Sequence, residues 1–513
     1  MKKIKFFAAV LLIIALLAGT FSACSDDDTA PTGETGAVQN GENSGSASSS
    51  KGEITFCYSK SDSLNPFFAQ GVTNQMLATL YCDPLFKVDN TFTANEVIAE
   101  NAEINDKRVT VTLKSTQFSD GSSVTASDVK YSFDLAKKST AYSAALSNVT
   151  SASVSGSKVV FNLSVADKYA KNVLTFPIVK SGTADDKDSR PIGSGRYKLD
   201  GTAQNPFFSV NTKNAAGNSA HFKTLSLLNL PDSDALINSL QIGNTDFIFD
   251  DLSTGSYKRI NATVKEVSLN NMVFLGINSS NEFLANDAIR QAVSAAIDRN
   301  AIATTAYQGH SVASALPFHP SWSELSAASI DPLPDYDKTK AETILKDAGI
   351  TEKNNKNVLL FNKKPITLKL IVNENNSFRN EAATLVSQQL EKIGFDVTVS
   401  VLSNENYIKA IKSGKYDLYI GEIKLSDNMD LNPLLKKGGS AFYGIKEDNA
   451  AISAYESSRS SQTTLAQFCD TFSTALPFIP LCFRNGVSAY SSDISSDVIS
   501  YDSDKFYNIE QWS

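Results

Sequence analysis

Strand-like and helix-like segments alternate along most of this sequence, and residues 366–401 give the clearest example. Apolar and polar residues alternate over 366–372 and again over 395–401, which is the period of a half-buried strand. Between them, residues 379–394 favour a helix that ends at a glycine, Gly394. A strand, a helix and a strand in this order predict a βαβ unit, in which the helix packs against a sheet. The pattern therefore predicts an α/β fold.

The same kinds of segment recur elsewhere in the chain. Further strands are expected at residues 54–58, 109–113, 161–165 and 272–277. Two helices carry capping signals at their N-termini. Thr125 precedes Asp128 by three residues, as in a capping box, and Asp337 precedes a run with helical apolar spacing. Strands and helices are thus expected over the whole folded part of the chain.

Length and composition bound the class of protein. The 513 residues correspond to about two to four domains of roughly 150 residues each. The formal net charge of −8 argues against a general nucleic-acid binder, because such a protein needs a basic face for phosphates. Only three histidines are present (His221, His310 and His319), which limits imidazole catalysis and metal binding. No nucleic-acid partner and no metal site are therefore expected.

The first residues predict export. Residues 1–23 combine an N-terminal group of lysines with an uninterrupted apolar run, as in a signal peptide. The stretch Phe21-Ser22-Ala23-Cys24 resembles a bacterial lipobox, so we expect cleavage before Cys24 and a diacylglycerol on its sulfur. An ordinary secretory signal with a chance cysteine is the alternative. Residues 24–51 are rich in Gly, Ser, Asp and Asn, which predicts a flexible linker between lipid and folded part.

Signatures of catalysis are missing from the sequence. It contains no G-x-S-x-G elbow and no H-E-x-x-H helix, and the glycines at 439 and 444 lack the lysine of a phosphate-binding loop. Four cysteines follow the signal, and no C-x-x-C pair occurs, so they are either disulfide-bonded or buried free thiols: Cys57, Cys82, Cys469 and Cys482. We therefore expect a protein that is not an enzyme and that needs no cofactor.

An ordered set of short motifs carries a family resemblance. The motifs are Ser63-Leu64-Asn65-Pro66-Phe67, Asp83-Pro84-Leu85-Phe86, Phe118-Ser119-Asp120-Gly121, Val124-Thr125-Ala126, Asp128-Val129-x-Tyr131-Ser132, Gly193-Ser194-Gly195-x-Tyr197, Ile289-Arg290-Gln291-Ala292, Ala296-Ile297-Asp298-Arg299, Tyr336-Asp337-x-x-Lys340-Ala341, Gln389-Leu390-x-x-Ile393-Gly394, Tyr416-Asp417 and Ile479-Pro480-Leu481. Taken together over residues 52–505, they resemble the bacterial extracellular solute-binding proteins of family 5, the peptide/nickel class that serves ABC importers.

The resemblance implies an architecture. It implies a two-lobed periplasmic-binding-protein fold (type II, cluster C-like) with an extra domain inserted in the first lobe. The expected divisions are residues 52–76, 182–270 and 476–513 for the first lobe, 77–181 for the extra domain and 271–475 for the second lobe. The ligand would lie between the lobes, which close around it by a hinge motion.

The resemblance also implies candidate ligand-binding residues in the first lobe and the extra domain. Gln70, Gly71 and Val72 match the pocket-lining stretch of the family. Gly71 would let a ligand approach the backbone, although a simple turn glycine is an equal alternative. Tyr142 matches an aromatic pocket position.

Further candidates follow two late motifs. Glu422 and Asp427 come after Tyr416-Asp417, where peptide binders place an acid for the ligand's α-amino group. Asp427 is the preferred anchor, and a solvated loop acid is its alternative. Phe483 and Arg484 match positions near the pocket, and Arg484 could bind a ligand carboxylate or form a salt bridge between the lobes.

These implications lead to a functional expectation. The chain is expected to be a lipid-anchored, monomeric, extracytoplasmic protein, on the outer face of the cytoplasmic membrane or in the periplasm. It would deliver an oligo- or dipeptide to a permease and its ATPase. The tryptophan that the family usually carries between Tyr416-Asp417 and the anchoring acid is absent. Another solute, such as chelated nickel, a sugar or an opine-like compound, therefore stays open, as does a sensory or surface role.

Overall fold

The computed structural model describes residues 53–230, 233–333 and 336–513. All of them lie within one compact unit of the chain, Ser50–Ser513. The expected signal peptide, the expected lipidation site Cys24 and the expected linker 24–51 lie outside the described residues. No helix in the described ranges is long and apolar enough to cross a membrane.

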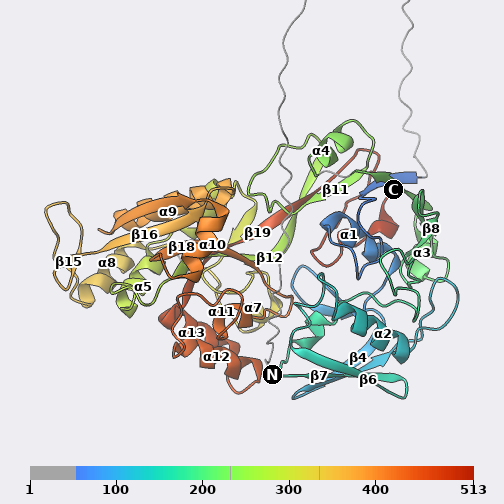
Figure 1. Cartoon of the computed structure of the whole chain (residues 1–513), viewed down its shortest axis with the longest axis horizontal. Coiled ribbons are helices and arrows are strands. Elements are labelled where there is room, and N and C mark those ends of the chain that lie inside the picture. Colours follow the sequence, from blue (N-terminus) through green and yellow to red (C-terminus); the bar gives the residue numbers. More distant parts are fainter. Residues whose placement is uncertain (1–52, 231–232, 334–335) are drawn as a thin grey trace, which may run out of the picture. The chain divides into compact units, whose positions relative to one another are not determined.

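Eleven strands of the described residues form one large sheet (Figure 1). Two long antiparallel strands occupy its middle, β12 (Thr263–Ile277) and β19 (Phe478–Tyr490). Beyond β12 lie β18 (Leu418–Lys424), β16 (Thr367–Asn373) and β17 (Asp396–Leu402). Beyond β19 lie β11 (Phe247–Asp250), β1 (Glu53–Tyr58), β10 (Thr224–Asn229), β9 (Pro206–Val210) and β8 (Tyr197–Gly201), while β13 (Ser311–Ala313) pairs with β19 from the side.

The expected βαβ unit is confirmed at one end of this sheet. Strands β16 and β17 pair in parallel from Thr367 opposite Asp396 to Asn373 opposite Leu402. The helix between them is α9 (Ser377–Glu391), which packs on both strands. The chain then turns at Gly394, whose φ of +93° only glycine adopts without strain.

Helix termini follow the predicted capping residues. Helix α2 (Ala126–Ala136) begins after Thr125, whose backbone N–H and hydroxyl donate to the Asp128 carboxylate at 2.9 and 2.6 Å. Helix α8 (Lys338–Asp347) begins after Asp337, whose carboxylate accepts from the Lys340 N–H at 2.9 Å. Both helices are therefore capped by the side chains that the sequence pattern indicated.

A separate four-stranded antiparallel sheet lies within residues 99–163. Its order is β4 (Ala99–Asn105), β5 (Arg108–Leu113), β7 (Lys158–Leu163) and β6 (Val149–Ser155), and α2 packs against β6 and β7. Strand β7 ends at Leu163, and Val165, which was expected in the same strand, is 48% exposed in the turn beyond it. Two short pairs complete the strands, β2 (Phe86–Val88) with β3 (Ala94–Glu96) and β14 (Leu360–Phe361) with β15 (Lys364–Pro365).

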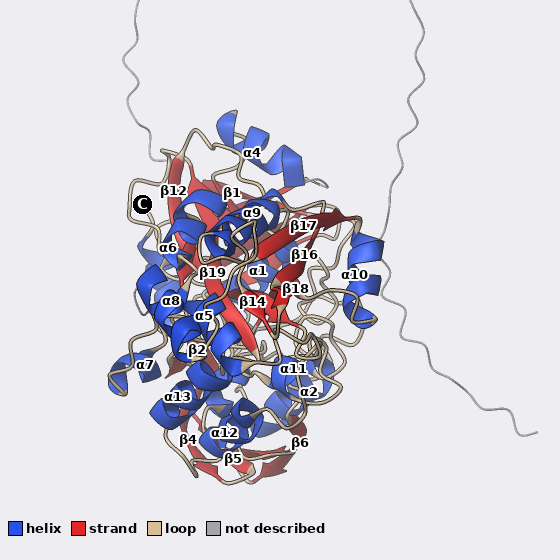
Figure 2. Cartoon of the chain, turned by 90° about the vertical axis from the view of Figure 1, so that its left-hand side faces the viewer, coloured by secondary structure: helices blue, strands red, loops and turns tan. Residues whose placement is uncertain are grey.

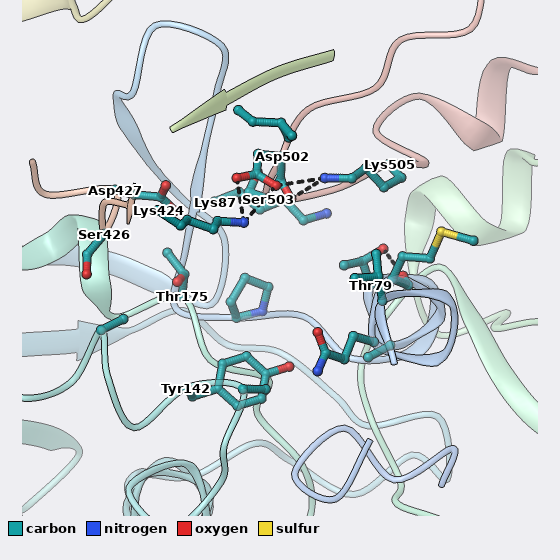
Figure 3. A pocket seen from close by; sticks show the side chains of 18 of the residues that line it. Thr79, Lys87, Tyr142, Thr175, Lys424, Ser426, Asp427, Asp502, Ser503 and Lys505 are labelled. Atoms are coloured by element: carbon teal, nitrogen blue, oxygen red, sulfur yellow. Dashed lines mark hydrogen bonds and ion pairs between the residues drawn. The ribbon is translucent and has the colours of Figure 1, made fainter. Parts of the chain in front are cut away.

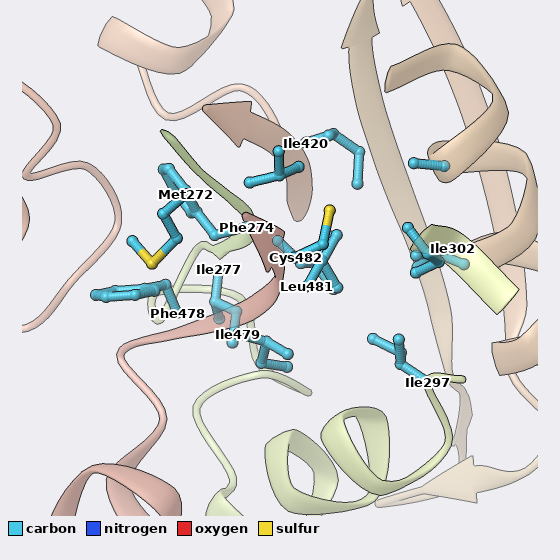
Figure 4. Close-up of a cluster of buried hydrophobic side chains, with 14 of the residues drawn as sticks. Met272, Phe274, Ile277, Ile297, Ile302, Ile420, Phe478, Ile479, Leu481 and Cys482 are labelled. Carbon is cyan, nitrogen blue, oxygen red and sulfur yellow. The ribbon is translucent and has the colours of Figure 1, made fainter. Parts of the chain in front are cut away.

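Two clusters of buried apolar side chains form the interior. One surrounds the middle of the large sheet, where Met272 and Phe274 of β12 meet Ile479 and Cys482 of β19 (Figure 4). It also contains the apolar faces of α5 (Asp287–Ala295), α9, α12 (Ala450–Arg459) and α13 (Leu465–Ala475). The other joins β1, helix α1 (Val72–Tyr81) and the four-stranded sheet to Phe506 and Trp512 near the C-terminus. The two clusters adjoin at the partly buried Ala94, which packs against both.

The remaining α-helices are short, and all of them except α3 are labelled in the side view of Figure 2. They are α3 (Ala215–Ser219), α4 (Ser233–Gln241), α6 (Arg299–Ala301), α7 (Ser323–Ala327), α10 (Asn404–Lys412) and α11 (Asn432–Leu435). The cysteines left open by the sequence are free, buried thiols: Cys57, Cys82, Cys469 and Cys482.

Candidate functional site

A cavity of about 450 Å³ lies between segments that are far apart in the sequence (Figure 3). Helix α1 forms one wall, and the segments 84–87, 141–145 and 172–177 form the walls beside it. The opposite side consists of residues 424–427, which follow β18, and residues 502–505 near the C-terminus. Its size falls within the range of ordinary ligand sites.

One wall of the cavity is a charged cluster. The Asp502 carboxylate lies between two lysines, 2.9 Å from Lys424 Nζ and 2.9 Å from Lys505 Nζ. Lys505 Nζ also lies 4.3 Å from the centre of the Phe249 ring, a cation–π distance. Lys87, beside them, is paired with Asp504 at 2.8 Å. Three cationic side chains thus face one cavity, each held by a carboxylate.

Burial and charge act differently on the members of this cluster. Burial alone would raise the pKa of Asp502, but Lys424 and Lys505 hold it well below the usual value. Burial is the main cause that lowers the pKa of Lys505, against the attraction of Asp502. The Lys424 side chain is 59% exposed. Water therefore screens its pairing, and Lys424 keeps donor capacity for a ligand.

Asp427 is the carboxylate of this wall that titrates near neutrality. Burial, and then the charge of Asp502, raise its pKa to about 7, although Lys424 and Lys505 oppose the shift. Its backbone carbonyl accepts from Asn172 Nδ2 at 3.1 Å, which fixes the loop that carries it. In the described residues its carboxylate has no hydrogen-bond partner, so it is available to a donor in the cavity.

The remaining walls are largely apolar. Met76, Phe86 and Leu269 contribute buried side chains, and Tyr142 lies half-buried on the side opposite the charged cluster. Burial is also the main cause that raises the pKa of Tyr142, so its hydroxyl stays protonated and can donate. An apolar surface facing a row of charges suits a ligand that has both kinds of group.

The predicted site residues divide between the cavity and its surroundings. Val72, Tyr142 and Asp427 line it. Gln70 and Gly71 lie just outside, where their backbone N–H groups donate to the Asp62 carboxylate at 2.9 Å each. Gly71 has an ordinary φ of −87°, so no turn requires a glycine there.

Glu422, Phe483 and Arg484 lie in the large sheet, away from the cavity lining. Glu422 of β18 and Arg484 of β19 form an ion pair across the intervening strand β12, with Arg484 Nε 2.7 Å from Glu422 Oε1. Phe483 is fully buried and packs edge-on against His319, with ring centres 5.1 Å apart. A direct contact of these three with a ligand stays a prediction.

Sequence reasoning missed the charged wall. Lys424 and Asp502 are 78 residues apart, and Asp502 and Lys505 lie in an irregular segment near the C-terminus. No short motif marks either segment, and only the folded chain brings them together.

A second cavity of about 240 Å³ adjoins this wall and shares Asp427, Asp502 and Ser503 with the first. In the described ranges, no group of three or more His, Cys, Asp or Glu side chains is placed to hold a metal ion.

Comparison with known proteins gives consistent results. A family model described as bacterial extracellular solute-binding proteins, family 5, middle part, matches residues 94–441. The glutathione-binding protein GsiB of Escherichia coli (strain K12) is 24% identical over 477 residues, which cover 84% of this chain and 89% of GsiB. The oligopeptide-binding protein AppA of Bacillus subtilis is 25% identical over 233 residues, covering 44% of this chain and 42% of AppA, less than half of either.

Solved structures share the fold. The crystal structure of a nickel ABC transporter from Bacillus halodurans superimposes with a TM-score of 0.71 and 17% sequence identity. The superposition covers 89% of this chain and 99% of that one. At this identity the likeness establishes the two-lobed fold and leaves the ligand open.

Proposed function

Because this chain belongs to family 5 of the bacterial extracellular solute-binding proteins, the non-enzymatic binding components of ABC importers, we propose that it captures short peptides. The cavity between α1 and the 424–427 segment would be the binding site. The observation that carries the proposal is the wall that brings Lys424, Asp427 and Lys505 to one apolar cavity. A short peptide has an ammonium group that matches Asp427, a carboxylate that matches the lysines, and apolar side chains that match the apolar walls.

The relatives support a peptide. AppA is named for oligopeptides and GsiB for glutathione, which is itself a tripeptide. In this proposal Asp427 accepts a charge-assisted hydrogen bond from the α-amino group. Lys424 donates to a carboxylate or carbonyl of the ligand, since its side chain is 59% exposed and Asp502 is the one carboxylate of the described residues paired with it. Tyr142 and Val72 contact side chains, and Gln70 and Gly71 border the entrance.

We further propose the division into lobes that the family resemblance implies. Residues 52–76, 182–270 and 476–513 would form the first lobe, 77–181 an extra domain on it, and 271–475 the second lobe. Strands β12 and β19 then cross between the lobes, and the pairing register of these two strands shifts between Ser268 and Asn271. An irregular pairing at this point is suited to a hinge.

Binding follows from this geometry without chemistry on the ligand. Lys424 and Asp427 come from the second lobe, and Asp502, Lys505 and Tyr142 come from the first lobe and its extra domain. A ligand contacts both sets only when the lobes are closed, so its differential affinity shifts the population toward the closed form. A permease and its ATPase would recognise that form, and Cys24 would hold the monomer at the membrane by its lipid.

Chelated metal is a second candidate. Lys87 and Lys424 line the cavity and can bind the carboxylates of a metal chelate, and this feature favours such a ligand over a bare ion. Lys505 adds positive charge, but its three N–H groups already donate to Asp502 and Tyr501. The two candidates differ in what they need from Asp427, because only a peptide brings an ammonium group to it.

Native mass spectrometry of the purified protein tests the proposal, together with a thermal-shift screen. The screen should contain pools of di- to octapeptides, sugars, and nickel in histidine or carboxylate chelates. We expect a co-purified mass of a short peptide and a raised melting temperature with peptide pools. Stabilisation by chelates or sugars alone would contradict the peptide assignment.

A further inference from the structure

Four buried polar side chains connect the proposed extra domain to the proposed second lobe beside the cavity. They are Asp167 and Asn172 on one side and Asn428 and Arg459 on the other, and we call them the clasp. The two oxygens of Asp167 are both used, one 2.5 Å from Arg459 and the other 2.8 Å from Asn428 Nδ2. Arg459 also donates to the Asn428 carbonyl. The ion pair is deep, since the Asp167 side chain is 4% exposed and that of Arg459 is 10% exposed.

Aromatic contacts flank the clasp along the same boundary. The Arg459 guanidinium lies 4.9 Å from the centre of the Tyr169 ring, and Tyr169 packs edge-on against Trp322 at 5.0 Å. Phe92 contacts His319 with ring centres 4.8 Å apart. At the exposed rim the hydroxyls of Thr93 and Ser323 are 3.0 Å apart. Two backbone hydrogen bonds cross the same boundary, from the Lys168 N–H to the Arg459 carbonyl and from the Ser323 N–H to the Thr91 carbonyl. The protein's own groups thus connect the proposed extra domain to the proposed second lobe without any ligand.

The clasp is connected to the binding site through one loop. Asn428 directly follows Asp427, the proposed anchor of the ligand. Asn172, which itself lines the cavity, donates to the Asp427 carbonyl at 3.1 Å and to the Phe92 carbonyl at 2.7 Å. Movement of the second lobe away from residues 167–172 would therefore carry the Asp427 loop with it.

We propose that the clasp stabilises the closed arrangement of the lobes and positions Asp427, so that part of closure is supplied by the protein itself. This inference rests on the proposed binding mechanism, but it holds for any ligand class. Opening would expose Asp167 and Arg459 together, whereas removal of one partner leaves the other as a buried, unpaired charge in the closed form. Asp167 and Asn172 are in this sense positioning residues, because they act on the ligand through Asp427.

Disulfide trapping tests the clasp without any ligand. Thr93→Cys with Ser323→Cys places two thiols at the rim, and the four native thiols of the described residues are buried. We expect this double variant to oxidise readily. Addition of Asp167→Asn should slow the oxidation by roughly tenfold, because the closed form becomes rarer. Asp134→Asn is the matched control, since it breaks an exposed pair with Lys130 on α2 and should leave the rate unchanged.

Asn172→Ala gives a second variant that introduces no unpaired charge, in case Asp167→Asn does not fold. It should also slow oxidation, by a smaller factor. An oxidation rate that is unchanged in the folded clasp variants would overturn the proposal. The proposal would also be overturned if the clasp never opens and ligand-dependent closure occurs elsewhere in the protein.

Peptide affinity separates positioning from a merely structural role. With trialanine as the probe, Asn172→Ala should weaken binding by roughly tenfold. N-acetylated trialanine has no ammonium for Asp427, so the same variant should reduce its affinity much less. Equal losses of affinity for the two peptides would show that Asn172 does not position Asp427. If trialanine does not bind the wild-type protein, this result counts against the peptide proposal. The oxidation rates would still show whether the clasp stabilises the closed arrangement.

Discussion

Arg484 Nε lies 2.7 Å from Glu422 Oε1 across strand β12, and the Arg484 side chain is only 2% exposed. Its Nη1 has no hydrogen-bond partner in the described residues. The Glu422 carboxylate therefore compensates the positive charge of the buried guanidinium. The pair joins the strand before the Asp427 loop to the strand that crosses between the proposed lobes. It fits the interlobe salt bridge that the sequence analysis gave as the alternative to ligand binding.

Glu422→Gln should therefore lower the free energy of unfolding strongly and change the affinity for peptides little. Loss of one partner of a buried pair costs about 3–5 kcal/mol, because the remaining charge stays desolvated. Urea unfolding followed by circular dichroism measures this loss. Glu282→Gln is the control, since the Glu282–Lys364 pair is exposed on both sides and should contribute less than about 1 kcal/mol. A large loss of peptide affinity at unchanged stability would instead place Arg484 in contact with the ligand.

Peptide affinity should depend on pH through Asp427. Its pKa in the ligand-free protein is about 7, so the carboxylate is mostly protonated at pH 6 and mostly ionised at pH 8. Only the ionised form attracts an ammonium group, and affinity for peptides with a free N-terminus should rise from pH 6 to pH 7.5. Calorimetric titration measures this slope, which Asp427→Asn should abolish. The same slope in that variant would assign the titration to another group.

His319 should make the fold sensitive to mild acid. Burial lowers its pKa to about 4, from an ordinary value near 6.5, so the folded protein keeps the ring neutral. Below pH 6.5 the unfolded chain gains a proton there and the folded chain does not, so stability falls as pH drops. Between pH 6.5 and 5 the loss should approach about 2 kcal/mol. His319→Asn should lose less over this interval, and parallel profiles for both proteins would contradict the assignment.

Gly193→Ala should destabilise the protein because of a backbone contact. A Cβ at Gly193 would lie 1.9 Å from the carbonyl oxygen of Tyr81, at the end of helix α1. Helix α1 and residues 193–195 would have to separate, which should cost at least about 2 kcal/mol. Gly71→Ala is the control, because its nearest contact would be an ordinary 3.4 Å to Asp62. A melting temperature that is equal in the two variants would contradict this account.

Local features of the fold could be predicted because local forces decide them. Periodicity predicted β16, α9 and β17, and side-chain caps predicted the starts of α2 and α8. Gly193 appeared in the sequence only as part of a family motif, and its close approach to Tyr81 supplies the physical reason for a glycine there. In the large sheet, β1 lies between β10 and β11, which no local pattern could indicate.

The candidate site shows the same limit more strongly. Asp427 could be proposed from its place after a family motif, and Tyr142 from an aromatic position. Lys424, Asp502 and Lys505 could not, since they form one cluster only after two distant segments fold together. The charged wall depends on contacts between residues that are far apart in the chain, whereas a single sequence shows only which residues are neighbours along it.

Calorimetric titration with trialanine and with its N-acetylated form at pH 8 tests the central claim most directly, in the wild-type protein and in Asp427→Asn. The account predicts that the wild-type protein binds the free form at least roughly tenfold more tightly, and that this preference disappears in the variant. Equal binding of both forms by the wild-type protein, or binding of nickel chelates in place of peptides, would contradict it.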